Sequence, residues 1–306
     1  MPEISADVRA RAIAALPMEE VGKKHGFWTG TGDSIRDIVA HRDLLGLLIR
    51  RELRARYKDS SLGVLWSLVR PLAQLLIYYF AIGGILGLAK GIPDFAIFVY
   101  VGLTAWTFFV EMISAGTNSV VDNSGLVKKI YLPREIFPLS AVGGALFNFA
   151  VQFAILLAAT AVLGRFPLSV DFLYAPLSIL VILVFGTAIA LFLSAWNVYL
   201  RDVQHLVEVA ILVLFWASPI VYSFKFVDHA LKGNWLEQIY LANPVTLVVL
   251  GMQKAIWVAG SHQPGVQNFP PNLDIRLLVA LAASFILLWL GQRVFSQLQG
   301  NFAQEL

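Results

Sequence analysis

Apolar runs, separated by short charged segments, dominate the chain from residue 62 onward. Six of these runs indicate membrane-spanning helices, at about 62–88, 95–120, 136–163, 172–200, 203–222 and 277–292. A helix of about 20 residues crosses the hydrocarbon layer of a membrane. Helices satisfy their own backbone hydrogen bonds in lipid, and the runs do not alternate as barrel strands do. The pattern therefore predicts an all-α integral membrane protein with six transmembrane helices.

A different pattern precedes the first run. Leu45, Ile49 and Leu53 recur every four residues, whereas arginines occupy another face of the same predicted helix. A helix with this distribution lies in the membrane interface, with its basic side chains toward lipid phosphates. The predicted domains are an N-terminal cytoplasmic tail (1–36), an amphipathic interfacial helix (37–60) and a six-span transmembrane domain (61–306).

The segment at about 223–260 is neither a polar loop nor an uninterrupted span. Its apolar part is broken by Asn243-Pro244 and carries Lys254. Proline biases the preceding residue away from helix. We expect two short re-entrant helices on the outer side of the membrane, and a helix lying on the outer leaflet is the alternative.

Composition and charge support this interpretation. The chain is 58% hydrophobic and 14% charged, whereas about a quarter of the residues of a soluble domain are charged. Of the 23 Lys and Arg residues, 17 flank the predicted spans on the side that holds the N-terminal region. The positive-inside rule then places both termini in the cytoplasm. A net charge of only +3 does not suggest a nucleic-acid partner, and the absence of cysteine excludes disulfides.

The sequence carries no motif for catalysis. It lacks the phosphate-binding loop GxxxxGK[ST], and its five histidines have no metal-ligand spacing. Glu111 and Glu208 lie within predicted spans, where acids are functional candidates. Each lies near the cytoplasmic end of its span, however, and a proton relay needs several acids at depth. We therefore expect no catalytic residue, metal or cofactor on this chain, which disfavours a proton-coupled carrier or a glycosyltransferase.

Four segments, in chain order, resemble permease subunits of ABC transporters that export polyprenyl-linked polysaccharides such as O antigens, capsules, teichoic acids and galactan. The resemblance covers the chain from about residue 37 to its end. The segments are RRELRARYKDSSLGVLWSLVRPL (50–72), NSGLVKKIYLPREIFPLS (123–140), NVYLRDVQHLVEVAILVLFWASPIVY (197–222) and NPVTLVVLGMQKAIW (243–257).

The resemblance implies a transport subunit that is not itself an enzyme. Two copies would form a channel in the bacterial inner or plasma membrane, and two copies of a separate ATP-binding subunit would hold ATP and Mg. In the loop at about 119–135, a short helix at about 126–131 would fit a groove on the ATPase, and Pro133 would end that helix. The implied coupling residues are Lys128, Lys129, Tyr131, Pro133, Arg134 and Glu135. Taken alone, the basic residues of this loop could be topology signals only.

The implied substrate is a polyprenyl-pyrophosphate-linked glycan, which would move outward from the cytoplasmic side. Arginine suits bidentate contact with phosphate, so the candidates for binding the headgroup are Arg50, Arg51, Arg54, Arg56, Tyr57 and Lys58. Sugars stack on aromatic rings, so the candidates for lining the channel are Tyr78, Tyr79, Phe80, Trp106, Phe108, Phe109, Trp216 and Tyr222. Each of these rings has an interfacial or lipid-facing role as its alternative.

Three other functions remain open at this point. A drug- or lipid-exporting ABC permease would be favoured by a large outer domain or a fused ATPase. A membrane enzyme acting on lipid-linked sugars would be favoured by paired acids at one membrane face. A passive structural subunit would not bind an ATPase. The identity of the glycan is also open.

Overall fold

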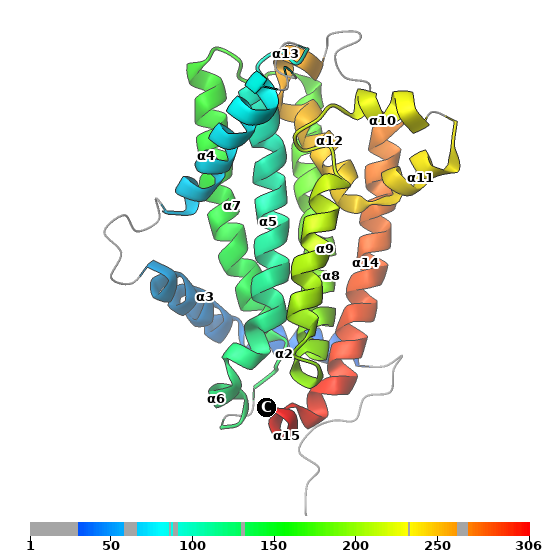
Figure 1. Ribbon diagram of the computed structural model, residues 1–306. Helices are drawn as coiled ribbons and strands as arrows, with labels where there is room; N and C mark the ends of the chain where they lie inside the picture. Colours follow the sequence, from blue (N-terminus) through cyan, green and yellow to red (C-terminus); the bar gives the residue numbers. More distant parts are fainter. Residues whose placement is uncertain are drawn as a thin grey trace, which may run out of the picture.

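The computed structural model describes residues 30–57, 66–85, 87, 91–129, 132–231, 233–261 and 269–306. Within these residues all the regular secondary structure is helical. The long helices run side by side as an upright bundle (Figure 1). They are α5 (Phe95–Asp122), α7 (Ile136–Val162), α8 (Tyr174–Tyr199), α9 (Val203–Trp216) and α14 (Leu273–Leu298).

Four of the six predicted spans are confirmed as long apolar helices, namely α5, α7, α8 and α14. The first predicted span is shorter in the described residues, where α4 (Trp66–Tyr78) continues into the π-helix η2 (Tyr79–Ile85). The fifth is α9, which has only 14 residues. It ends before Ser218-Pro219, because proline lacks the amide hydrogen that a continuing helix needs. The described part of the chain thus holds four candidate spans, or up to five with one bent helix pair, and the prediction of six is not confirmed.

The bent pair lies in the segment predicted to be re-entrant. Helices α11 (Trp235–Ala242) and α12 (Pro244–Ile256) meet at 79°. Asn243 between them is extended, and its side chain accepts a hydrogen bond from the backbone N–H of Val245 at 3.0 Å. Two short helices broken at Asn243-Pro244 are therefore confirmed, and their insertion into the outer leaflet stays a prediction. Helices α10 (Phe224–Leu231) and α13 (Val258–Ser261) lie at the same end of the bundle (Figure 1).

Small residues let α8 pack tightly between two neighbours. A Cβ atom on Gly116 of α5 would lie only 2.5 Å from the Cβ of Ala190. A Cβ atom on Gly291 of α14 would lie 2.6 Å from the carbonyl oxygen of Ala188. The largely buried α12 packs on α8, α5 and α14 as well. We call these four helices, α5, α8, α12 and α14, the frame.

The opposite end of the bundle carries the short helices α2 (Thr31–Ala40), α6 (Ser124–Val127) and α15 (Phe302–Glu305), with α3 (Arg42–Tyr57) to one side of it (Figure 1). We call this the basic end. The helix expected at 37–60 is divided here, because the chain turns at His41 between α2 and α3. Helical structure also begins at Thr31, within the segment expected to be a tail, and residues 58–60 lie outside the described ranges.

Candidate functional site

The apolar face of α3 docks on α7. Leu48 is buried, and a Cβ atom on Gly143 of α7 would lie 2.5 Å from Cδ1 of Ile49. One residue further along α7, Glu52 of α3 lies against Gly144. The two glycines therefore let α3 approach the α7 backbone closely. The location of α3 in the membrane interface stays a prediction.

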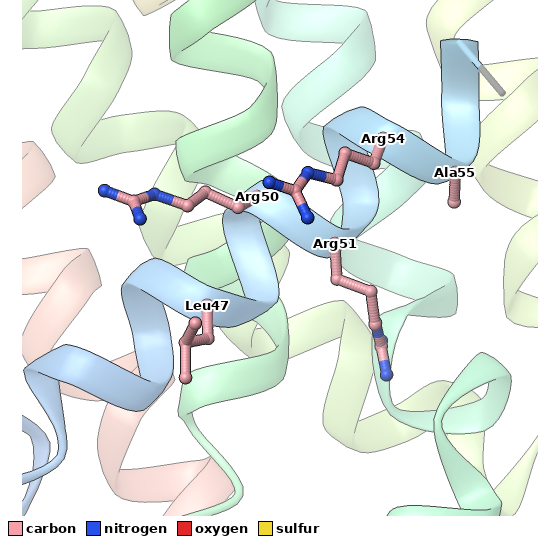
Figure 2. A pocket seen from close by; sticks show the side chains of 5 residues that line it. All are labelled: Leu47, Arg50, Arg51, Arg54 and Ala55. Atoms are coloured by element: carbon pink, nitrogen blue, oxygen red, sulfur yellow. The ribbon is translucent and has the colours of Figure 1, made fainter.

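The basic face of α3 forms an open pocket of about 630 Å³. Figure 2 shows Arg50 and Arg54 extending to one side and Arg51 pointing away from them. All three arginines are exposed, and no carboxylate among the described residues pairs with Arg50 or Arg54. The lining residues are Leu47, Arg50, Arg51, Arg54 and Ala55. This is a cluster of positive charge that is open to an anion.

The other headgroup candidates are only partly visible. Arg56 and Tyr57 belong to the last turn of α3, but their side chains and the whole of Lys58 lie outside the described residues. Their role stays a prediction.

Arg51 also reaches the loop between α5 and α7. Its guanidinium donates a hydrogen bond to the side-chain oxygen of Asn123, the residue that precedes α6. The amide of Asn123 in turn donates to the carbonyl oxygen of Ser119 at 2.7 Å. One arginine of the pocket is therefore bonded to the start of the predicted coupling segment.

A short helix is present in this loop, but it lies earlier in the sequence than predicted. Helix α6 covers Ser124–Val127 instead of about 126–131, and Tyr131 lies outside the described residues. The expectation that Pro133 ends this helix is wrong, because α6 ends at Val127. The carbonyl oxygen of Pro133 instead accepts a hydrogen bond from Ile136 at 3.2 Å, in the turn that leads into α7.

The charged residues of this loop separate into exposed and buried ones. Lys128 and Lys129 are exposed directly after α6. Arg134 is half-buried, and its guanidinium carbon lies 5.7 Å from the centre of the Phe302 ring. Glu135 is only 3% exposed, and burial raises the pKa of its carboxyl above the ordinary value, with a smaller contribution from the charge of Asp37.

The C-terminal residues form part of this surface, which sequence reasoning missed. Phe302 of α15 is fully buried, with ring-centre distances of 5.4 Å to Phe295 and 6.1 Å to Tyr199. The hydroxyl of Tyr199 donates to the carbonyl oxygen of Leu298 at 2.7 Å. Helix α15 also packs on α6. A lone phenylalanine within the polar sequence QGNFAQE was the signal that could have revealed this contact.

The aromatic candidates on α4 and α9 meet at Phe215, a residue that the prediction omitted. Tyr78 of α4 stacks on Phe215 of α9 with ring centres 5.7 Å apart. Trp216 is exposed, and its carbonyl oxygen accepts a hydrogen bond from the hydroxyl of the half-buried Tyr222 at 2.8 Å. The neighbouring Tyr79 and Phe80 are exposed as well.

The three aromatic candidates on α5 lie in the interior of the bundle. Trp106, Phe108 and Phe109 are at most 6% exposed. Phe108 stacks on Phe149 of α7 at 4.5 Å, and Phe109 stacks on Phe185 of α8 at 5.9 Å. In this conformation their rings contact protein and not an open surface.

Helix α9 presents charge on an otherwise apolar surface. His205 and Glu208 are both exposed, and their Nδ1 and Oε2 atoms lie 3.7 Å apart. Exposed apolar side chains surround them on the same helix: Leu206, Val209, Leu212 and Val213. In the described ranges, no group of three or more His, Asp and Glu side chains could hold a metal ion.

Comparison with known proteins gives a consistent result. Residues 43–257, from the start of α3 to the end of α12, match the ABC-2 type transporter family. An O-antigen export system permease protein, RfbA, of Myxococcus xanthus is 30% identical over 274 residues, which cover 89% of this chain and 98% of that relative. A protein of the same name from Klebsiella pneumoniae is 28% identical over 265 residues, covering 86% and 95%. The polysialic acid transport protein KpsM of Escherichia coli is 23% identical over 247 residues, covering 78% and 88%.

Proposed function

Because the chain belongs to the ABC-2 type transporter family, we propose that it is the membrane subunit of an ATP-driven exporter of a polyprenyl-pyrophosphate-linked polysaccharide. One observation carries the proposal: Arg51 of the open arginine pocket on α3 donates a hydrogen bond to Asn123, the residue that directly precedes the short helix α6. A phosphate-binding face and an ATPase-coupling segment are what such an exporter needs at its cytoplasmic end. The permeases of O-antigen and polysialic acid systems among its relatives support the substrate class.

The pocket suits a lipid pyrophosphate by its charge and its place. Arginine binds phosphate oxygens through paired N–H groups. An amphipathic helix at the membrane surface brings such groups to the depth of lipid headgroups. Arg50, Arg51 and Arg54 would therefore meet the pyrophosphate, while the attached polyprenyl chain stays in the bilayer.

The ATPase would bind at the basic end. Lys128 and Lys129 follow α6 and are exposed, so they are available to an acidic groove on the ATPase. Glu135 and Arg134 contact the C-terminal segment of the same chain instead. Their proposed role is to hold α6 and the start of α7 together, so that movement of the ATPase passes to the spans as a rigid body. Both termini would then be cytoplasmic.

The channel would form between two copies of the chain, along α4 and α9. An exposed acid on a spanning helix is costly in lipid, so the exposed Glu208 favours a position of α9 beside a partner copy or a water-filled lumen. Tyr79 and Phe80 are exposed on η2, which continues α4, and Trp216 is exposed on α9. Their rings would stack on successive sugars, and such contacts tolerate different glycan sequences.

ATP hydrolysis tests this function. The purified chain would be combined with its candidate ATPase in lipid vesicles, with and without a polyprenyl-pyrophosphate glycan. Stimulation by the glycan lipid, and not by phospholipid alone, is expected. Stimulation by phospholipid or by drugs alone would favour the drug- or lipid-exporting permease. Failure to form any complex with an ATPase would contradict the exporter assignment and favour a membrane enzyme or a structural subunit.

A further inference from the structure

We propose that Arg51 is the positioning residue through which an occupied headgroup pocket acts on the coupling helix α6. This inference rests on the proposed function, and it names the residue pair that joins substrate binding to ATP hydrolysis. The pair is Arg51 on α3 and Asn123 at the junction of α5 and α6.

Arg51 belongs to both sites at once. It lines the pocket, and its guanidinium donates a hydrogen bond to the side-chain oxygen of Asn123, 72 residues later in the chain. Arg50 and Arg54 line the same pocket but extend to its other side (Figure 2). A guanidinium has five N–H donors in a planar fork. Arg51 can therefore keep its hydrogen bond to Asn123 and donate another to a phosphate oxygen. Arg51 is therefore suited to join the two.

Asn123 determines where α6 begins. Its carbonyl oxygen accepts hydrogen bonds from the backbone N–H groups of Leu126 at 2.9 Å and Val127 at 3.1 Å. Its side-chain amide fastens it to the end of α5 through Ser119. Helix α6 has only four residues, and these bonds position it together with the burial of Val127 and the packing of α15. A shift of Asn123 moves α6 and the two lysines that follow it.

The docking of α3 makes this link stiff. The close approach of α3 to α7 at Gly143 and Gly144 leaves α3 little room to absorb a movement of Arg51. A phosphate bound in the pocket would order the guanidinium between two acceptors, the phosphate and Asn123. The occupied pocket then favours one position of α6 over others, which is the differential interaction that a ligand needs to shift a conformational equilibrium.

The test separates ligand affinity from coupling. ATP hydrolysis by the complete complex in phosphatidylcholine vesicles would be measured against the concentration of undecaprenyl pyrophosphate. Undecaprenol and inorganic pyrophosphate serve as probes for the lipid chain alone and for the free anion. For each variant, the half-maximal concentration and the maximal stimulation are recorded, and assembly with the ATPase is checked by gel filtration.

We expect Asn123→Ala to keep the half-maximal concentration and to lower the maximal stimulation about fivefold or more. Asn123→Asp retains an acceptor oxygen and should restore coupling. Arg51→Lys keeps the charge but loses the fork, so its maximal stimulation should be lowered as in Asn123→Ala.

Arg50→Ala should have the opposite effect: it should raise the half-maximal concentration about tenfold and leave the maximal stimulation unchanged. Arg42→Ala, an exposed arginine of α3 outside the pocket, is the matched control.

Two results overturn the inference in different ways. Wild-type maxima in both Asn123→Ala and Arg51→Lys would show that the Arg51–Asn123 bond carries no signal, while the exporter function stands. A wild-type complex that binds the ATPase but ignores undecaprenyl pyrophosphate and the polyprenyl-pyrophosphate glycan would overturn the headgroup pocket and the inference together.

Discussion

The side-chain amide of Gln299 donates a hydrogen bond to the buried carboxylate of Glu135, with Nε2 and Oε1 3.4 Å apart, across 164 residues of sequence. This bond joins the residues that follow α14 to the residue that precedes α7. Together with the Arg134–Phe302 contact, it fixes the C-terminal segment against the loop between α6 and α7. The basic end is therefore built from distant parts of the chain.

The raised pKa of Glu135 makes the stability of the chain depend on pH. Burial disfavours the charged carboxylate in the folded state, so its pKa lies above the ordinary 4.5. The folded state then binds the proton more tightly than the unfolded state. Its stabilising contribution is complete below pH 4.5 and is lost as the pH rises through the raised pKa. Glu135→Gln should remove this dependence of the apparent Tm on pH.

The measurement is thermal unfolding in detergent between pH 4 and 8, for wild type and Glu135→Gln. Asp43→Asn, which changes an exposed carboxylate at the start of α3, is the control. Equal pH slopes for wild type and Glu135→Gln would show that this carboxyl does not titrate with folding.

The contact between α5 and α8 should not tolerate a larger residue at Gly116. Gly116→Val would press its side chain into Ala190 and should destabilise the folded state by about 1–3 kcal/mol, as overpacking does. Adding Ala190→Gly should recover part of this loss. Gly46→Ala on α3 meets open space and should be neutral or slightly stabilising. Thermal unfolding of wild type and the three variants measures this, and a double variant no more stable than Gly116→Val would refute the contact.

The two exposed lysines after α6 should contribute to ATPase binding. Lys128→Ala/Lys129→Ala removes two charges that the structure leaves at the surface, so binding should weaken about tenfold and depend less on salt. Surface plasmon resonance at several salt concentrations measures both effects. Arg201→Ala removes an exposed cation from the loop between α8 and α9 and should leave binding unchanged. Equal losses in both variants would indicate a general charge effect and not a coupling site.

Two candidate rings should be needed for transport: Tyr78 of α4, which is partly buried against Phe215, and Trp216 of α9, which is exposed. Tyr78→Ala and Trp216→Ala should each slow glycan export several-fold, since a ring contact contributes about 0.5–1.5 kcal/mol beyond its area. Trp216→Phe should keep most of the activity. Trp235→Ala removes an equally accessible ring from α11 and serves as the control. Export is measured as surface glycan at matched membrane levels of the protein, and full export in all variants would rule out the aromatic channel.

The elements that could be predicted from the sequence are those set by local pattern. Long apolar runs identified α5, α7, α8 and α14, and a single proline located the break between α11 and α12. The same rule, applied to Pro219, would have ended α9 at its observed length. Helix α6 was misplaced because a helix of one turn leaves almost no periodic signal.

The contacts that build the site could not be predicted in this way. In the sequence Phe302 is an isolated apolar residue, and only the structure shows that it packs against Phe295 and Tyr199. The Arg51–Asn123 bond joins residues that are 72 positions apart in the sequence, and no local sequence pattern relates residues at that distance. Trp106, Phe108 and Phe109 were predicted to line the channel, but they lie in the interior of the bundle. In a membrane helix the protein-facing side and the open side are both apolar, so composition alone does not distinguish them.

The glycine and alanine contacts within the frame have a practical consequence. At these contacts the helix backbones lie close together, with few side-chain rotamers between them that could rearrange. The distances among α5, α8 and α14 should therefore stay constant while the transporter works. The frame is thus an internal reference for spectroscopy. The chain contains no cysteine, so a pair of spin labels, one on the frame and one on α6 or α9, can be introduced without a background signal. Changes in their separation during ATP turnover would then report movement of the labelled helix alone.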